Sequence, residues 1–415
     1  MLEHINPKAP FANTLNRIPF ILQIVIGLII GILMAFVYPN DDQYIPMLGT
    51  LFVKALKSVA PLLVFVLVSS AIAKHESGTP SNMKTVIMLY IIGMVLSAAL
   101  ALGMATTFPS TFSELAQANT SLNPPKGVSE VLLNFIVQAI DNPVNALMNA
   151  NYIAILFWSV CLGLMFRVSR TETKRVLEDL AQSVSGVVRI IIRFAPLGVL
   201  GLVYSSCTQE GGFSNLLNYL HVVVVLVVTM LIIAFIINPL MAFLVTKENP
   251  FPLVRTCIAK SAITAFFTRS SAANLPVNLE LCEQLKLPKS TYTISIPLGC
   301  TINMSGAAVT IVIMTMAAVH TMGIEVDFGS ALLMSIAAVL CACGCSGIAG
   351  GSLMLIPLAC SIFGINNDIA MQVVGIGFII GVVQDSFETA LNSHTDVLFT
   401  AAACRKAEKD QAAAK

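Results

Sequence analysis

The sequence predicts an all-α polytopic membrane protein, and three observations support this fold class. Of the 415 residues, 56% are hydrophobic and only 11% are charged, whereas soluble domains carry about 25% charged residues. Several apolar runs are long enough to cross a bilayer as a helix, which takes about 20 residues. Such continuous runs exclude an outer-membrane barrel, whose strands are short and alternating. The net charge of +1 offers no basic field for nucleic acid.

The N-terminal part of the chain predicts six spans. Their approximate ranges are 19–38, 45–73, 86–107, 152–166, 180–204 and 217–244. The fifth span is expected to be bent near Pro196, and the polar stretch 108–128 is expected to form an outside loop. Lys and Arg flank alternate ends of these spans, which places both termini in the cytoplasm. The ten cysteines lie mostly in apolar segments, so no disulfide framework is expected.

Beyond residue 250, two apolar segments have centres rich in Ser and Gly. They read TAFFTRSSAANLPV (264–277) and CACGCSGIAGGSLMLIPL (341–358). Non-helical backbone is tolerated in a membrane only where it is buried or lines a cavity, so each segment predicts a re-entrant helical hairpin. Between them lies TINMSGAA (301–308), where Asn303 and Gly306 are expected to loosen a helix so that its carbonyls can hold Na⁺.

The stretch 375–403 is apolar enough to span a membrane, yet it carries a stripe of polar side chains. The members share one helix face, at i, i+3, i+4, i+7 and i+11; they are Asp385, Glu388, Thr389, Asn392 and Asp396. A carboxylate in hydrocarbon costs several kcal/mol unless it is paired or lines a wet cavity. The acidic stripe therefore predicts a ligand or ion site, and the alternative is a structural network of ion pairs.

Taken together, these segments resemble the dicarboxylate/amino acid:cation symporter family, which includes the glutamate transporters. TRSSAANLP, TINMSG, SGIAGG and the acidic stripe stand in the family's order, and the resemblance covers nearly the whole chain. Within the family, the chain is similar to the bacterial sodium-dependent serine/threonine transporters. The resemblance implies a glutamate-transporter-like fold of eight transmembrane helices and two re-entrant hairpins. It also implies a homotrimer in the bacterial inner membrane, surrounded by lipid, that works as an elevator.

The same resemblance implies a division of the chain into domains and a set of ligands. Residues 1–249 would be mainly scaffold and trimerisation helices, with span three joining the transport domain. Residues 250–404 would form the core of the transport domain, and residues 405–415 a cytoplasmic tail. The expected substrate is a small neutral amino acid, foremost serine or threonine. Na⁺ would be the coupling ion, and no organic cofactor is expected.

The family's substrate site carries over residue by residue. Asp385 matches the aspartate that holds the substrate ammonium, and Asn392 matches the asparagine that contacts the α-carboxylate, with Thr389 beside them. The two hairpin tips complete the implied site, with backbone N–H groups and the positive charge of Arg269. The first tip contributes Arg269, Ser270 and Ser271, and the second contributes Ile348 and Gly350.

Two sodium sites are implied in the same way. Asp396 matches a sodium-ligating aspartate, with the carbonyls of Gly299, Asn303 and Asn392 as companions. The second site would use carbonyls of the second hairpin and of the helix before it; the residues are Ala342, Cys343, Cys345 and the region of Thr301.

Departures from the family pattern bear on the substrate. Glu388 stands where members with acidic substrates have an arginine, the natural bidentate partner of a carboxylate. Glu388 would either repel acidic substrates and accept a hydroxyl, or be held by Arg269, whose expected partner is Asp385 or Glu388. Ser305 replaces an aspartate and the stretch Leu89–Gly93 is apolar, so a third sodium site is not expected. Ala349 replaces a hairpin proline.

Other functions remain open at this point. A symporter of the same fold for other small neutral or acidic amino acids, proton coupling, and a passive channel are alternatives. Residues 344–347 read Gly-Cys-Ser-Gly, which with His394 also fits an intramembrane serine protease whose nucleophile would be Ser346. Cys341, Cys343 and Cys345 have a spacing more typical of packing than of a metal site.

Overall fold

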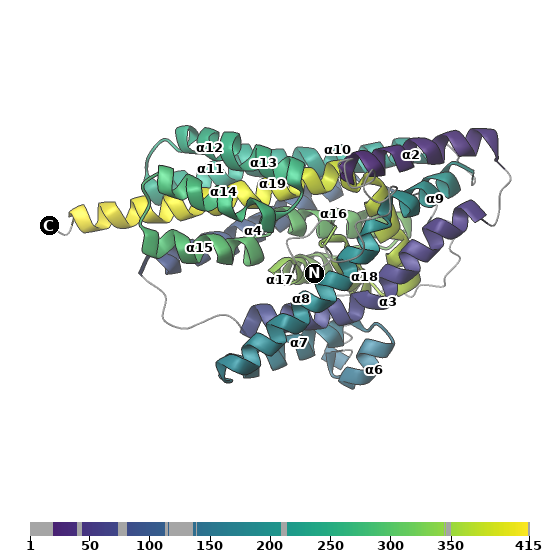
Figure 1. The fold of residues 1–415 in the computed structure, drawn as a ribbon, viewed down its shortest axis with the longest axis horizontal. Coiled ribbons are helices and arrows are strands. Elements are labelled where there is room, and N and C mark those ends of the chain that lie inside the picture. Colours follow the sequence, from purple (N-terminus) through teal and green to yellow (C-terminus); the bar gives the residue numbers. More distant parts are fainter. Residues whose placement is uncertain are drawn as a thin grey trace, which may run out of the picture.

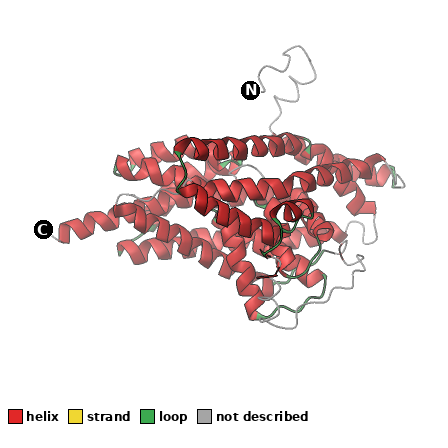
Figure 2. Cartoon of the chain, turned by 90° about the horizontal axis from the view of Figure 1, so that it is seen from below, coloured by secondary structure: helices red, strands yellow, loops and turns green. Residues whose placement is uncertain are grey.

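The computed structural model describes residues 20–39, 44–73, 81–112, 115, 136–137, 139–208, 214–343, 345 and 350–413. Within this part of the chain every regular element is a helix and there is no strand (Figure 2). The prediction of an all-α protein is therefore confirmed. All ten cysteines are free thiols in this structure.

One group of helices packs together along the right and lower sides of the view in Figure 1. It consists of α2 (Phe20–Val37), α3 (Tyr44–Ala73), α6 (Pro143–Met148), α7 (Tyr152–Arg167), α8 (Thr171–Arg193) and α9 (Ala195–Thr208). Glycine lets two helix backbones of this group lie close together. If Gly31 of α2 carried a Cβ, that atom would lie only 2.7 Å from the carbonyl oxygen of Leu200 in α9, which is too close. Glycine at this position thus allows α2 and α9 to pack in contact.

The fifth predicted span is a bent pair, with α8 and α9 meeting at 54°. The bend falls at Phe194, two residues before Pro196, so the prediction of a bend near this proline is confirmed. Pro196 itself lies in the first turn of α9, where a proline needs no N–H partner. The span also starts earlier than residue 180, since α8 begins at Thr171. Its first turns are polar, and only one face is buried; the apolar members of that face are Leu177, Ala181, Val184, Val188 and Ile192.

A second group is built around α16 (Ser305–Thr321) and α19 (Asn367–Ala413). Every residue of α16 from Ser305 to Val319 is buried, as expected of a helix that is apolar on all sides. Both helices are contacted by α4 (Ser81–Thr107) and α10 (Ser214–Ile232). Span six therefore packs with the C-terminal elements, although the sequence grouped it with the scaffold.

Span six continues from α10 through a π-helical segment, η3 (Ile233–Ile237), into α11 (Asn238–Thr246). The π-helical turn directly precedes Pro239, which lacks an N–H to donate to the carbonyl of Phe235. The sequence predicted a continuous helix here, because hydropathy carries no signal for a local change of helix type.

Both predicted hairpins are present. The first runs through α12 (Phe251–Cys257), η4 (Ile258–Ala262) and α13 (Ile263–Thr268), and returns as α14 (Ser271–Gln284). The second descends as α17 (Phe328–Cys343) and returns as η5 (Leu353–Leu355) and α18 (Ile356–Ile362). Asp327 caps the start of α17 by accepting from the backbone N–H groups of Gly329 and Ser330, at 2.8 and 3.1 Å. Hydrogen bonds lower the pKa of Asp327, led by the one from the Ser330 hydroxyl.

Among the described residues, five helices are long and apolar enough to cross a membrane, or six if α8 and α9 count as one. The shorter apolar helices Leu22–Val37 and Ile153–Arg167 coincide with the first and fourth predicted spans. Two more, Phe328–Cys343 and Leu353–Ile362, are the arms of the second hairpin. The helices thus follow the predicted plan of eight spans and two hairpins, with α15 (Lys289–Ile302) and α16 as the two halves of span seven.

Candidate functional site

The acidic stripe lies on α19, which runs along the long axis of the molecule and ends near the C-terminus (Figure 1). Its five members are all buried; the exposed fractions are 2% for Asp385, 5% for Glu388, 5% for Thr389, 3% for Asn392 and 2% for Asp396. Buried carboxylates require partners. The partners come from both hairpins, from α16 and the break before it, and from α19 itself.

Arg269 pairs with Asp385. The chain reverses at Arg269, which has a left-handed backbone (φ 50°) at the end of α13. Its Nε lies 2.7 Å from Asp385 Oδ2, and both side chains are buried. Of the two partners that the sequence left open for Arg269, the structure selects Asp385. Arg269 therefore does not hold Glu388 in this conformation.

The second hairpin also reaches Asp385. The backbone N–H of Gly350 donates to Asp385 Oδ1 over 3.3 Å. Gly350 has a positive φ of 73°, and a Cβ there would lie 2.9 Å from the ring of Phe378. Glycine is thus needed both for the turn and for the close approach of the hairpin to α19. The other second-tip residue of the predicted site, Ile348, lies outside the described residues, as does Ala349.

Glu388 is held by three hydrogen bonds that converge on Oε2. The donors are the Thr310 hydroxyl at 2.7 Å, the Ser352 hydroxyl at 2.8 Å and the Gln384 amide at 2.5 Å. All three bonds lie on this one oxygen. These three donors were not predicted from the sequence. Gln384 was the most detectable of them, since it is a polar residue one turn before Glu388 in an apolar helix.

Asn392 joins α19 to the start of α16. Its Oδ1 accepts from the backbone N–H of Gly306 over 2.7 Å. A Cβ on Gly306 would lie 2.9 Å from the backbone of Glu388. The helix breaks at Asn303 and Met304, as the sequence predicted for this region. Gly306, however, lies within α16 and allows close packing rather than loosening the helix.

Asp396 lies against that break. Its Oδ1 accepts from Asn303 Nδ2 over 2.8 Å, while Asn303 Oδ1 is buried without a partner among the described residues. Gly299 packs directly on the carboxylate, since a Cβ there would lie 2.5 Å from Asp396 Oδ1. The structure therefore brings together Gly299, Asn303 and Asp396. Oxygen donors of this kind suit a hard cation such as Na⁺.

Tyr90 is a further neighbour of this region that was not predicted from the sequence. Its hydroxyl is fully buried and lies 3.2 Å from the carbonyl oxygen of Ser295 and 3.4 Å from that of Asp396. The stretch Leu89–Gly93 was interpreted as apolar, and this interpretation is wrong at Tyr90. The only signal was a single tyrosine in an otherwise apolar run.

The residues predicted for a second sodium site are only partly brought together. Cys343 Sγ lies 3.6 Å from the carbonyl oxygen of Ile302, so the ends of α17 and α15 are adjacent. The carbonyl of Ala342 accepts from the N–H of Cys345 at 3.0 Å. Thr301 is exposed, and its hydroxyl donates to the Leu298 carbonyl of its own helix. No cluster of three or more His, Cys, Asp or Glu suited to a metal occurs in the described part of the chain.

The first hairpin tip is fixed by capping and by a buried polar network. Ser270 caps α14, its Oγ accepting from Ala273 N at 3.2 Å, and Ser271 is the first, buried residue of that helix. Below the tip, four buried side chains link the two arms to α19 through hydrogen bonds of 2.6–3.3 Å; they are Ser261, Asn274, Asn278 and Ser393. This network was not predicted, although two asparagines at i and i+4 signal it.

A comparison with protein-family profiles matches residues 20–405 to the sodium:dicarboxylate symporter family. The chain belongs to this family. Members of the sodium:dicarboxylate symporter family are secondary transporters and not enzymes, so the protease alternative fails. Its candidate nucleophile Ser346 lies outside the described residues, and His394 hydrogen-bonds the carbonyl of Ala390. The protein is thus a multi-pass membrane symporter coupled to sodium.

Proposed function

We propose that this symporter carries small neutral amino acids, with serine and threonine as the preferred substrates. The observation that carries this proposal is the charge of the buried site. Asp385, Glu388 and Asp396 are three buried carboxylates of α19, and Arg269 is the only buried Lys or Arg among the described residues. Arg269 pairs with Asp385, whereas Asp396 lies about three turns further along the helix. With all four ionised, three negative charges and one positive charge give −2. A dicarboxylate would add to this excess, whereas a zwitterion with Na⁺ reduces it.

Glu388 is the proposed reader of the substrate side chain. Three donors fix its Oε2, so the carboxylate has one defined orientation. Oε1 is then the acceptor for the hydroxyl of serine or threonine. The same carboxylate repels the side chain of aspartate or glutamate. Other small neutral amino acids lack the hydroxyl and are the nearest alternative substrates, ahead of acidic ones.

The ammonium and α-carboxylate groups, which all amino acids share, are assigned to Asp385, Thr389 and Asn392 of the acidic stripe. The ammonium group approaches Asp385 Oδ1, whose partner here is the N–H of Gly350 on the proposed gate, whereas Oδ2 is paired with Arg269. The α-carboxylate is assigned to Asn392 and Thr389, with backbone N–H groups at Ser270, Ser271, Ile348 and Gly350. The contacts of Gly350 with Asp385 and of Ser352 with Glu388 support the second hairpin as the gate.

Sodium is assigned to Asp396 with the carbonyls of Gly299, Asn303 and Asn392. The unpartnered Asn303 Oδ1 supports a cation in this position. A second ion is proposed at the carbonyls of Ala342, Cys343, Cys345 and the Thr301 region. One Na⁺ crossing about 100 mV down a tenfold gradient supplies roughly 3.7 kcal/mol. That is enough to accumulate a neutral substrate several hundredfold, so few ions suffice.

Transport is proposed to follow an elevator mechanism in a homotrimer of the inner membrane, with both termini cytoplasmic. The helices α2, α3 and α7–α9 would form the scaffold. The moving body would comprise both hairpins, α15, α16 and α19, together with α4 and α10–α11, which pack on them. This division moves span six out of the scaffold. The contacts between the two bodies include the rings of Phe52 and Phe378, whose centroids are 5.0 Å apart.

The test is uptake of labelled serine by proteoliposomes, with Na⁺ and H⁺ gradients imposed separately. An inward Na⁺ gradient should drive accumulation, and unlabelled threonine should compete while aspartate should not. Uptake driven by the H⁺ gradient alone would point to proton coupling, and uptake indifferent to both gradients would point to a passive channel. Strong competition by aspartate would overturn the proposal of a neutral substrate.

A further inference from the structure

A largely apolar groove of about 630 Å³ runs between α4 and α17, the first arm of the second hairpin. The two helices are antiparallel, because Cys343 Sγ at the end of α17 lies 4.0 Å from Met94 Sδ, while the lining of α4 continues from there to Thr106. Thr106 and Asp327 therefore lie at the other end of the groove. Gly103 also lines the groove, and the space in front of it is open, since no atom lies within 4 Å of an added Cβ.

Asp327 is the one charged side chain among the lining residues of this groove. Its carboxylate is half-buried, with Oδ1 accepting from the N–H groups of Gly329 and Ser330 and Oδ2 from the Ser330 hydroxyl. These bonds keep the pKa of Asp327 below its ordinary value, so the group is ionised at neutral pH. The donors are neutral, and no Lys or Arg in the described part of the chain pairs with Asp327. Its negative charge thus remains open to a cation that enters the groove.

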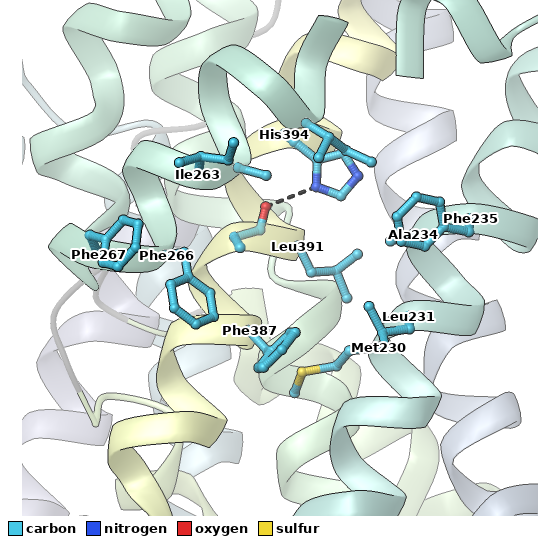
Figure 3. Close-up of a pocket in the computed structure, with 13 residues that line it drawn as sticks. Met230, Leu231, Ala234, Phe235, Ile263, Phe266, Phe267, Phe387, Leu391 and His394 are labelled. Atoms are coloured by element: carbon cyan, nitrogen blue, oxygen red, sulfur yellow. Dashed lines mark hydrogen bonds between the residues drawn. The ribbon is translucent and has the colours of Figure 1, made fainter. Parts of the chain in front are cut away.

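The cavity beside the first hairpin lacks such a group. Figure 3 shows that its walls come from α10, η3, the hairpin and α19. Among its lining residues His394 is the only polar one, and this side chain is buried. Only the groove between α4 and α17, of these two spaces, therefore presents an accessible charge that can select a ligand.

We propose that the groove between α4 and α17 binds a cationic amphiphile, an alkylammonium, as a ligand distinct from the transported substrate. The alkyl chain lies on the apolar faces of the two helices, and the ammonium group donates to Asp327. The Thr106 hydroxyl already donates within its own helix, so its oxygen is left to accept. A phospholipid fits less well, because no Lys or Arg lines the groove to pair with its phosphate. A fatty acid carries the wrong charge.

Binding in this groove is expected to affect the second hairpin. An alkyl chain packed on both helices holds α17 against α4, and the tip that follows α17 reaches Asp385 through Gly350. The ligand should therefore slow serine uptake without competing with serine. This consequence rests on the proposed function, whereas binding itself does not and is measured without transport.

The test uses the purified full chain in phosphatidylcholine nanodiscs and a decylamine with a photoreactive group at the end of its chain. Mass spectrometry locates the labelled peptides, which are expected within residues 95–106 and 326–339. The competitors are decylamine and 1-decanol at equal mole fractions in the bilayer; they share a chain, although only the amine is charged. The amine should compete about five- to tenfold more strongly, as expected for one hydrogen-bonded ion pair at a partly exposed carboxylate.

Two variants and one control separate the charge from the groove. Asp327→Asn keeps a side chain that caps α17 and should remove the difference between amine and alcohol. Gly103→Leu fills the open space and should weaken competition by both. Glu325→Gln removes an exposed acid outside the lining and should leave the difference unchanged.

Three results would overturn the proposal: labelling elsewhere, equal competition by amine and alcohol in the parent protein, or an equal loss in Glu325→Gln. Adding phosphatidylethanolamine to the nanodiscs should leave the labelling as it is. Displacement of the probe by that lipid would make the occupant a phospholipid and would also overturn the proposal. The parent protein alone decides most of these outcomes, so the test stands even if a variant folds poorly.

Discussion

At the scale of single residues, the charge of Glu388 is the feature that separates neutral from acidic substrates. In Glu388→Gln, an amide oxygen still accepts from Thr310 and Ser352, so the fold should persist. Removing the negative charge removes the repulsion of a second carboxylate. Aspartate should then compete with serine at least about tenfold better, since like charges a few ångströms apart cost more than about 1.4 kcal/mol at intermediate dielectric. Competition in the proteoliposome uptake assay measures this change.

The matched control is Glu280→Gln, which makes the same chemical change on an exposed face of the first hairpin. It should leave competition by aspartate as it is in the parent protein. If Glu388→Gln behaves like this control, Glu388 does not face the substrate side chain.

Gly299 tests the sodium assignment at the same scale. A Cβ at this position would lie 2.5 Å from Asp396 Oδ1, so Gly299→Ala should displace the carboxylate. The Na⁺ concentration for half-maximal uptake should rise about tenfold or more, because disturbing the orientation of one metal ligand typically weakens metal binding by that factor. Gly381→Ala in α19 is the control, because no atom lies within 4 Å of its added Cβ. An unchanged Na⁺ dependence in Gly299→Ala would remove Asp396 from the ion site.

Residue by residue, the sequence was most informative where a polar group stands in an apolar helix. A carboxylate in hydrocarbon has few structural explanations, so the stripe of α19 was recognisable. The hydroxyl partners of Glu388 could not be recognised from the sequence. Thr310 and Ser352 belong to residue types that are common in membrane helices, and only the folded structure shows that they donate to Glu388. Tyr90 was missed for a similar reason, since its ring is apolar and its hydroxyl finds a partner only after packing.

At the scale of elements, the first hairpin is fixed to α19 by the buried pair of Arg269 and Asp385. Removing either partner leaves a buried charge, which costs about 3–5 kcal/mol. Arg269→Gln and Asp385→Asn should therefore each lower the thermal midpoint of the purified protein, and the double variant should recover most of the loss. Serine uptake should stay abolished in the double variant, because the ammonium partner is missing. A midpoint shift that is additive in the double variant would show that the two side chains are not coupled.

Arg255→Gln serves as the control for this cycle, since Arg255 is an exposed residue of the same hairpin. Its thermal midpoint should match that of the parent.

The helical elements themselves were largely predictable because hydropathy reports burial in lipid directly. The errors came from backbone effects that hydropathy does not carry. The polar stretch 171–179 extended α8, and a π-helical turn preceded Pro239. Both hairpins were predicted from Ser and Gly content, since a break in a membrane helix must be buried or line a cavity.

At the scale of the whole molecule, an exposed ion pair joins the two packing groups. Lys57 of α3 pairs with Asp368 at the start of α19. An exposed pair contributes at most about 1 kcal/mol and is weakened by salt. Such a contact can open during transport, in contrast to the buried pair of Arg269 and Asp385. The division of the chain into bodies came from the family resemblance, which grouped span six with the scaffold. Hydropathy alone does not separate the bodies, because burial against protein and burial in lipid have the same hydropathy.

The last prediction tests motion between the two bodies. Cross-linking Lys57→Cys to Asp368→Cys with a short thiol reagent should abolish serine uptake, because α3 and α19 then cannot slide past each other. Reduction of a cleavable linker should restore uptake. The control pair is Glu248→Cys with Lys409→Cys, whose parent side chains lie 2.8 Å apart and join two elements of the proposed moving body. That cross-link should leave uptake nearly intact, as should the reagent on the parent protein. Full transport with α3 linked to α19 would exclude an elevator movement of these two groups.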